Sequence, residues 1–188
     1  MTKSKLIILS DIWGELNKQW TDVYIENMSY NFDITYLDIR KLAEIDLSLT
    51  NQEDLHQAFI DGGIEKAVNA LLDFTKEGAT ILAFSMGGTI AWKASLKGLK
   101  ATSLHLVSAT RNRYEEIAIT VDTTLYFGEL DNFQPTPEWI GKMELKNQLR
   151  IFKNLGHECY REKEVAKEII KSLLKKKSFP FILWSFID

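Results

Sequence analysis

The sequence has very little cysteine and very little proline. Among its 188 residues there is one cysteine, Cys159, and there are three prolines. A single cysteine forms no internal disulfide, and without a Cys-x-x-Cys pair a zinc ribbon or finger is excluded. A protein with so little cysteine fits a reducing compartment, so we expect a cytoplasmic protein. No Pro-rich or Gly-rich linker divides the chain, which predicts one domain over residues 1–188.

The chain also lacks an excess of positive charge and a long apolar run. Its 23 Lys and Arg residues face 26 Asp and Glu residues, for a formal net charge of -3. Such a chain has no positive field with which to neutralise phosphates, so nucleic acid is not an expected partner. The N-terminal apolar run at 6–9 breaks at Ser10-Asp11 and is too short for a signal sequence or a membrane span.

Short apolar runs and helical patterns alternate along the rest of the chain. Hydrophobic residues make up 45% of the sequence, as in an ordinary soluble domain. Near-continuous β-branched and aromatic runs suit strands buried on both faces, and they occur at 6–9, 34–37, 80–84, 103–107, 124–127 and 149–152. Apolar residues at helical spacing lie between them. The alternation predicts a doubly wound, mostly parallel α/β sheet of about six strands, with helices on both faces and no cap domain.

In such a sheet, sites form beyond the carboxyl ends of the strands. Ser85 directly follows the run at 80–84 and precedes a helical stretch, so it lies on a tight strand-to-helix turn. The close approach of strand and helix requires small residues two before and two after the serine, here Ala83 and Gly87. Two roles are open for Ser85: a nucleophile, or an ordinary cap of the following helix.

An acid and a histidine follow two later strands. Asp131 comes after the run at 124–127, and His157 comes after the run at 149–152. A serine hydroxyl becomes a good nucleophile only when a base takes its proton. The base works best when a carboxylate orients it and stabilises its charged form. We therefore expect Ser85, His157 and Asp131 to lie together on one edge of the sheet.

Other residues compete for these roles. Glu129 is a rival acid in the same loop as Asp131. His105 alternates with leucines in a predicted strand, which favours a buried histidine with a satisfied side chain. Cys159 follows His157 closely, and we expect a small buried thiol there. The set of His105, His157 and Cys159 lacks metal-site spacing, so no metal is expected.

The chain order Ser85, Asp131, His157 and the turn around Ser85 resemble the α/β-hydrolase superfamily over most of the chain. The resemblance implies an oxyanion hole formed by the backbone N–H groups of Ile12 and Met86. It also favours Asp131 over Glu129, because the family's acid follows Gly-x-x. The compact size, the missing cap and the loop at 11–14 are similar to small dienelactone-hydrolase-like proteins. Those proteins carry cysteine where this chain has Ser85.

From the residues and the resemblance together we expect a serine hydrolase. It would cleave a small to medium carboxylic ester or thioester through an acyl-enzyme intermediate. Neither a Gly-x-Gly-x-x-Gly nor a Walker motif follows a strand, so no cofactor is expected. The alternative is a catalytically silent member of the fold that binds a small molecule or a protein partner. Trp13, Phe133 and Trp139 either line an apolar rim or pack in the core.

The last segment, 178–188, is almost entirely apolar. Phe179, Phe181, Ile182, Leu183, Trp184, Phe186 and Ile187 leave it almost no polar face. It is too short to span a membrane. We expect a hydrophobic C-terminal arm that packs over an exposed sheet edge or across the partner in a homodimer.

Overall fold

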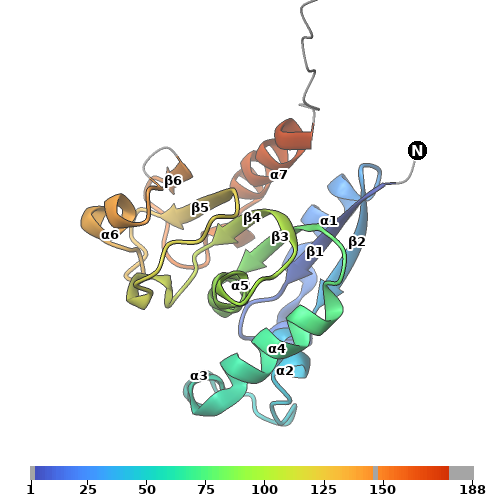
Figure 1. Cartoon of the computed structure of the whole chain (residues 1–188), viewed down its shortest axis with the longest axis vertical. Helices are drawn as coiled ribbons and strands as arrows, with labels where there is room; N and C mark the ends of the chain where they lie inside the picture. The colour runs from blue at the N-terminus through green and yellow to red at the C-terminus, as the bar shows by residue number, and fades with distance from the viewer. Residues whose placement is uncertain (1–2, 146–147, 178–188) are drawn as a thin grey trace, which may run out of the picture.

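The chain folds around a six-stranded, all-parallel sheet with the order β2-β1-β3-β4-β5-β6 (Figure 1). This computed structural model describes residues 3–145 and 148–177. The observed sheet confirms the predicted fold class. The strands are β1 (Ser4–Leu9), β2 (Phe32–Leu37), β3 (Ala79–Phe84), β4 (Ala101–Val107), β5 (Thr123–Gly128) and β6 (Leu149–Phe152).

Helices cover both faces of the sheet (Figure 1). On one face lie α1 (Asp22–Met28) and α7 (Lys163–Lys177). On the other lie α2 (Ile39–Leu42), α3 (Gln52–Ala58), α4 (Ile64–Phe74), α5 (Met86–Leu96) and α6 (Pro137–Lys142). Short turns of other helical types are η1 (Gly14–Asn17), η2 (Gln19–Thr21), η3 (Phe59–Gly63), η4 (Asn112–Tyr114) and η6 (Cys159–Arg161).

Each central strand contributes side chains to two cores, one on each face of the sheet. In β1, Ile7 and Leu9 belong to the core under α4 and α5, whereas Leu6 and Ile8 belong to the core under α1 and α7. Because neighbouring side chains of a strand point to opposite faces, a strand covered on both sides must be apolar at every position. This explains the near-continuous apolar runs of the sequence.

The connections between strands add no cap domain in the described part of the chain. Between β4 and β5 the only helical element is the short turn η4. The Asp38-Ile39-Arg40 segment after β2 has a structural role, since Asp38 caps α2 and the buried Arg40 donates to the carbonyl oxygens of Leu47 and Leu49 at 2.9 and 3.0 Å. None of the helices in residues 3–145 and 148–177 combines the length and apolar composition that crossing a membrane requires.

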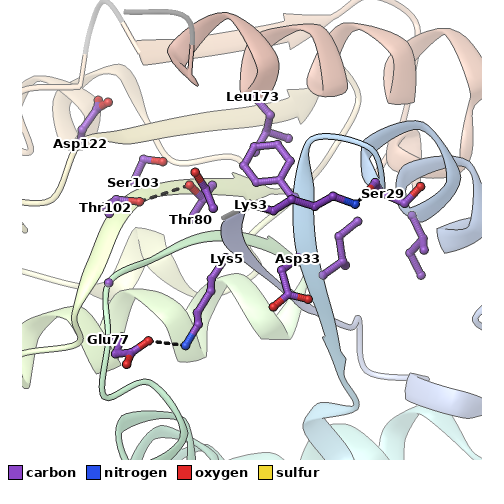
Figure 2. A pocket seen from close by; sticks show the side chains of 15 residues that line it. Lys3, Lys5, Ser29, Asp33, Glu77, Thr80, Thr102, Ser103, Asp122 and Leu173 are labelled. Carbon is purple, nitrogen blue, oxygen red and sulfur yellow. Dashed lines mark hydrogen bonds and ion pairs between the residues drawn. The ribbon is translucent and has the colours of Figure 1, made fainter. Parts of the chain in front are cut away.

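A hollow of about 1250 Å³ opens at the amino ends of the strands (Figure 2). Its walls come from the beginnings of β1 to β4, from α1, and from Leu173 of α7. Charged residues at the hollow include Lys5, which pairs with Glu77. Neither Ser85, Asp131 nor His157 lines it, so this hollow lies at the end of the sheet away from the predicted chemistry.

Candidate active site

Ser85 occupies a sharp turn between the last residue of β3 and the first residue of α5. Its backbone has φ 50° and ψ -117°, a conformation that costs energy for any residue with a side chain. The Ser85 N–H donates to the Val107 carbonyl oxygen at 2.8 Å, which fixes the turn against β4. The hydroxyl makes no capping bond to α5. Instead, Oγ lies 3.0 Å from Nε2 of His157, which does not fit the capping role.

Two glycines let α5 begin close to the ends of the neighbouring strands. A Cβ on Gly87 would collide with the Ser10 carbonyl oxygen and crowd Leu9. A Cβ on Gly88 would come within 2.7 Å of the Ala109 Cβ, just beyond β4. The small residue expected at position 87 is therefore required by packing against the chain that leaves β1.

His157 lies between Ser85 and Asp131. Its Nδ1 is 3.0 Å from Oδ2 of Asp131, whose side chain is completely buried, while 25% of the His157 side chain remains exposed. The other carboxylate oxygen, Oδ1, accepts the Phe133 N–H at 2.9 Å. A carboxylate without a proton only accepts hydrogen bonds, so this arrangement suits the His157 tautomer in which Nδ1 donates to Asp131 and Nε2 accepts from the Ser85 hydroxyl.

The two loops that carry the acid and the histidine are joined by backbone contacts. Leu130 N–H donates to the Leu155 carbonyl oxygen at 2.8 Å. The rival acid Glu129 accepts the Asn154 N–H at 2.9 Å through Oε2 and so supports the loop before His157. The structure brings Asp131, not Glu129, into hydrogen-bond contact with His157.

The Ile12 and Met86 backbone N–H groups follow the ends of β1 and β3 by three and two residues. Met86 is the first residue of α5, where an N–H has no acceptor within the helix. No acceptor is found for the Ile12 N–H among the residues that the structure describes. Trp13, the next residue, donates its N–H to Oδ1 of Asp11 at 3.0 Å, which holds the loop in shape.

Asp11 forms a buried network that the sequence reasoning missed. Its side chain is almost fully buried, and Oδ2 accepts from the Tyr160 hydroxyl and from Arg161 Nη2, both at 3.2 Å. Burial raises the pKa of Asp11, and the Arg161 charge opposes this shift. Arg161 also pairs with Glu158 at 2.9 Å. An acidic residue after an apolar strand was the available signal, because a buried carboxylate needs such partners.

The other two candidate residues, His105 and Cys159, are buried and contact neighbouring side chains. His105 is fully buried, and its Nδ1 lies 2.9 Å from the Tyr126 hydroxyl. Cys159 is buried 3.6 Å from Ser108 Oγ, and burial raises the pKa of its thiol. In the described ranges, no group of three or more His, Cys, Asp or Glu side chains is arranged to hold a metal ion.

The three aromatic residues of the predicted rim separate into different environments. Trp139 is buried against Trp92 with ring centroids 5.3 Å apart, and Trp13 packs against the same core. Phe133 is 37% exposed and meets the His157 ring edge-on, with centroids 5.0 Å apart. Phe133 is therefore the member of this set that borders the candidate site.

A scan of protein-family models and a search of curated proteins found no match to this sequence. Solved structures do match. A candidate hydrolase of the α/β superfamily from Xanthomonas campestris is 16% identical, with a TM-score of 0.67 over 94% of this chain and 99% of that one. A carboxylesterase structure from Nitrososphaera gargenis is 13% identical, with a TM-score of 0.64 over 92% and 90%.

A candidate dienelactone hydrolase from Klebsiella pneumoniae has a TM-score of 0.67 and 10% identity, over 93% of this chain and 86% of that one. At identities this low, the structural similarity shows a shared fold only, and a function has to be argued from the residues of the site. The parallel strand order, the turn at Ser85 and these similarities agree. The chain therefore has the α/β-hydrolase fold.

Proposed function

We propose that this protein is a serine hydrolase that cleaves a small to medium carboxylic ester or thioester. One observation carries the proposal: Ser85 Oγ, the two ring nitrogens of His157 and Asp131 Oδ2 form a continuous chain, with 3.0 Å at each hydrogen bond. Ser85 has a positive φ, and its side chain makes no capping bond to α5. A capping role therefore does not account for its strained backbone, whereas a nucleophile held against His157 does.

In the proposed reaction, Ser85 Oγ attacks the substrate carbonyl carbon while His157 Nε2 takes the hydroxyl proton. The charge that develops on His157 is stabilised by the buried Asp131 carboxylate. The N–H groups of Ile12 and Met86 donate to the oxyanion of the tetrahedral intermediate. When this intermediate collapses, His157 returns the proton to the departing alcohol or thiol.

Water then completes the cycle. It attacks the acyl-Ser85 carbonyl carbon and gives a proton to His157. The second intermediate then releases the carboxylic acid, and Ser85 Oγ takes the proton back from His157 to restore the hydroxyl. The similarity to a carboxylesterase structure supports an ester as the substrate class. A free alcohol or thiol leaving group requires no further catalytic side chain.

Active-site labelling tests this proposal. A fluorophosphonate probe should label the protein at Ser85, and the protein should hydrolyse 4-nitrophenyl acetate, because both reactions need an activated serine. Ser85→Ala should abolish both while leaving the thermal midpoint nearly unchanged. Ser95→Ala is the matched control, because the Ser95 hydroxyl only donates to the Ala91 carbonyl oxygen within α5. A folded protein that takes up no label and hydrolyses no ester would be catalytically silent.

A further inference from the structure

Two arginines lie on the loop that follows β4, and one of them, Arg113, contacts Phe133 at the border of the candidate site. The guanidinium carbon of Arg113 lies 4.4 Å from the Tyr114 ring centroid and 5.1 Å from that of Phe133. The guanidinium carbon of Arg111 lies 5.1 Å from the centroid of the same Tyr114 ring. Phe133 in turn meets His157 edge-on, so the same aromatic ring contacts both the Arg113 guanidinium and the proposed base.

The hydrogen bonds of the Arg113 side chain go to neutral groups. It donates to the Thr110 carbonyl oxygen and, at 2.8 Å, to the Tyr114 hydroxyl. These contacts use only part of the five donors of a guanidinium. Arg111 and Arg113 are both half-buried, and neither is paired with a carboxylate in residues 3–145 and 148–177.

Two acidic residues close to the arginines, in sequence or in the site, have cationic partners, whereas Glu116 is an exposed residue. Glu115 pairs with Lys93 at 2.9 Å, and Glu158 pairs with Arg161 at 2.9 Å. The Glu115 and Glu158 carboxylates are therefore already bound to other cations. The two arginines leave a positive charge beside a site whose substrate, in the proposed reaction, must lie against His157.

We propose that Arg111 and Arg113 bind an anionic group of the substrate, so that the enzyme prefers carboxylate-bearing esters over neutral ones; this rests on the proposed function. A planar guanidinium matches a carboxylate in geometry, and partial burial strengthens the charge-assisted hydrogen bonds. The Phe133 ring contacts both His157 and Arg113, so it offers an apolar surface to the part of the substrate between the scissile ester and its charged end. The preferred substrate is thus an ester with a short apolar spacer and a terminal carboxylate.

Paired substrates measure this preference. On the acyl side, the 4-nitrophenyl monoester of adipic acid is compared with 4-nitrophenyl hexanoate. On the alcohol side, 4-acetoxybenzoate is compared with neutral 4-acetoxybenzamide. Rates are corrected with Ser85→Ala to remove spontaneous hydrolysis. We expect a higher kcat/KM for the anionic member of at least one pair, and a ratio that falls as salt screens the charge.

Variants of Arg113 test the assignment to this side chain. Arg113→Met keeps the apolar stem but removes the charge, and it should lower kcat/KM for the preferred anionic ester roughly tenfold, leaving its neutral partner within about twofold. Arg113→Lys should recover part of the preference. Arg150→Met is the matched control, since Arg150 is an exposed residue of β6 that donates to the Leu149 carbonyl oxygen at 3.1 Å.

Two results would overturn the assignment while leaving the hydrolase intact. One is the absence of any preference for an anionic ester in a protein that hydrolyses the neutral esters. The other is an equal loss of both members of a pair in Arg113→Met, which would mean that Arg113 only supports the loop. A protein that neither reacts with fluorophosphonate nor hydrolyses any of the four esters would overturn both this inference and the proposed function.

Discussion

Oδ2 of Asp131 lies 3.0 Å from Nδ1 of His157, although the two residues are 26 positions apart in the sequence. Asp131 is fully buried there, and its second oxygen is held by the Phe133 N–H. Glu129, in the same loop, instead accepts the Asn154 N–H. The backbone between β5 and β6 thus gives two neighbouring acids different roles, one facing the histidine and one supporting the loop that carries it.

This difference predicts a large loss of activity for one conservative substitution and a small loss for another. Asp131→Asn should lower kcat for ester hydrolysis by roughly 10³-fold or more, because an amide no longer fixes the His157 tautomer or stabilises its charged form. His157→Ala should be similarly damaging. Glu129→Gln should cost much less, and steady-state rates on 4-nitrophenyl acetate measure all three. If Glu129→Gln were the damaging change and Asp131→Asn harmless, the acid would have been misassigned.

Gly87→Ala should destabilise the protein and reduce its activity together. The added methyl group would meet the Ser10 carbonyl oxygen, which is backbone and cannot move aside without shifting the loop that carries Ile12. Overpacking of this kind costs about 1–3 kcal/mol. Thermal unfolding and esterase rate are the measurements. Gly78→Ala is the control, since its Cβ would meet only the Thr102 methyl group, at 3.3 Å. Equal effects of the two substitutions would contradict the close approach at Gly87.

The buried Asp11 predicts a pH-dependent contribution to stability. Its pKa is raised, chiefly by burial, so the folded state favours the protonated carboxyl. The stability that this group contributes is present below its ordinary pKa of about 4 and is lost as the pH rises through the folded value. As the pH rises from acid to neutral, the thermal unfolding midpoint of Asp11→Asn should therefore rise relative to that of the parent protein. A shift in the opposite direction would mean that attraction to Arg161 outweighs burial.

The segment 178–188 lies outside the described residues, and its role as a hydrophobic arm stays a prediction. Helix α7, which precedes it, lines the hollow at the amino edge of the sheet through Leu173. Deleting 178–188 should lower solubility or change the oligomeric state, because its seven large apolar side chains are costly to leave in water. Static light scattering and a solubility assay measure both. A soluble truncation of unchanged mass, stability and esterase rate would show that the segment is dispensable.

The sequence alone determined the fold class and the order of the candidate residues along it. Its short runs are apolar at successive positions because strands covered on both faces must be, and the helical patterns between them require parallel strands with crossovers. Small residues at 83 and 87 around Ser85 marked the turn, because only a close approach of strand and helix requires them. These features are local, so they can be read from neighbouring residues.

Only the tertiary structure decided which polar groups meet. The sequence left Asp131 and Glu129 as rival acids by residue type, and the pairing of the β5 and β6 loops separated them. The contact between Asp11 and Arg161 joins two segments that are far apart in the sequence. The contact between Arg113 and Phe133 joins the loops that follow β4 and β5. No spacing rule encodes such contacts, because side-chain direction at the end of a strand depends on how each loop packs against the next. The candidate site is therefore a product of packing at one edge of the sheet.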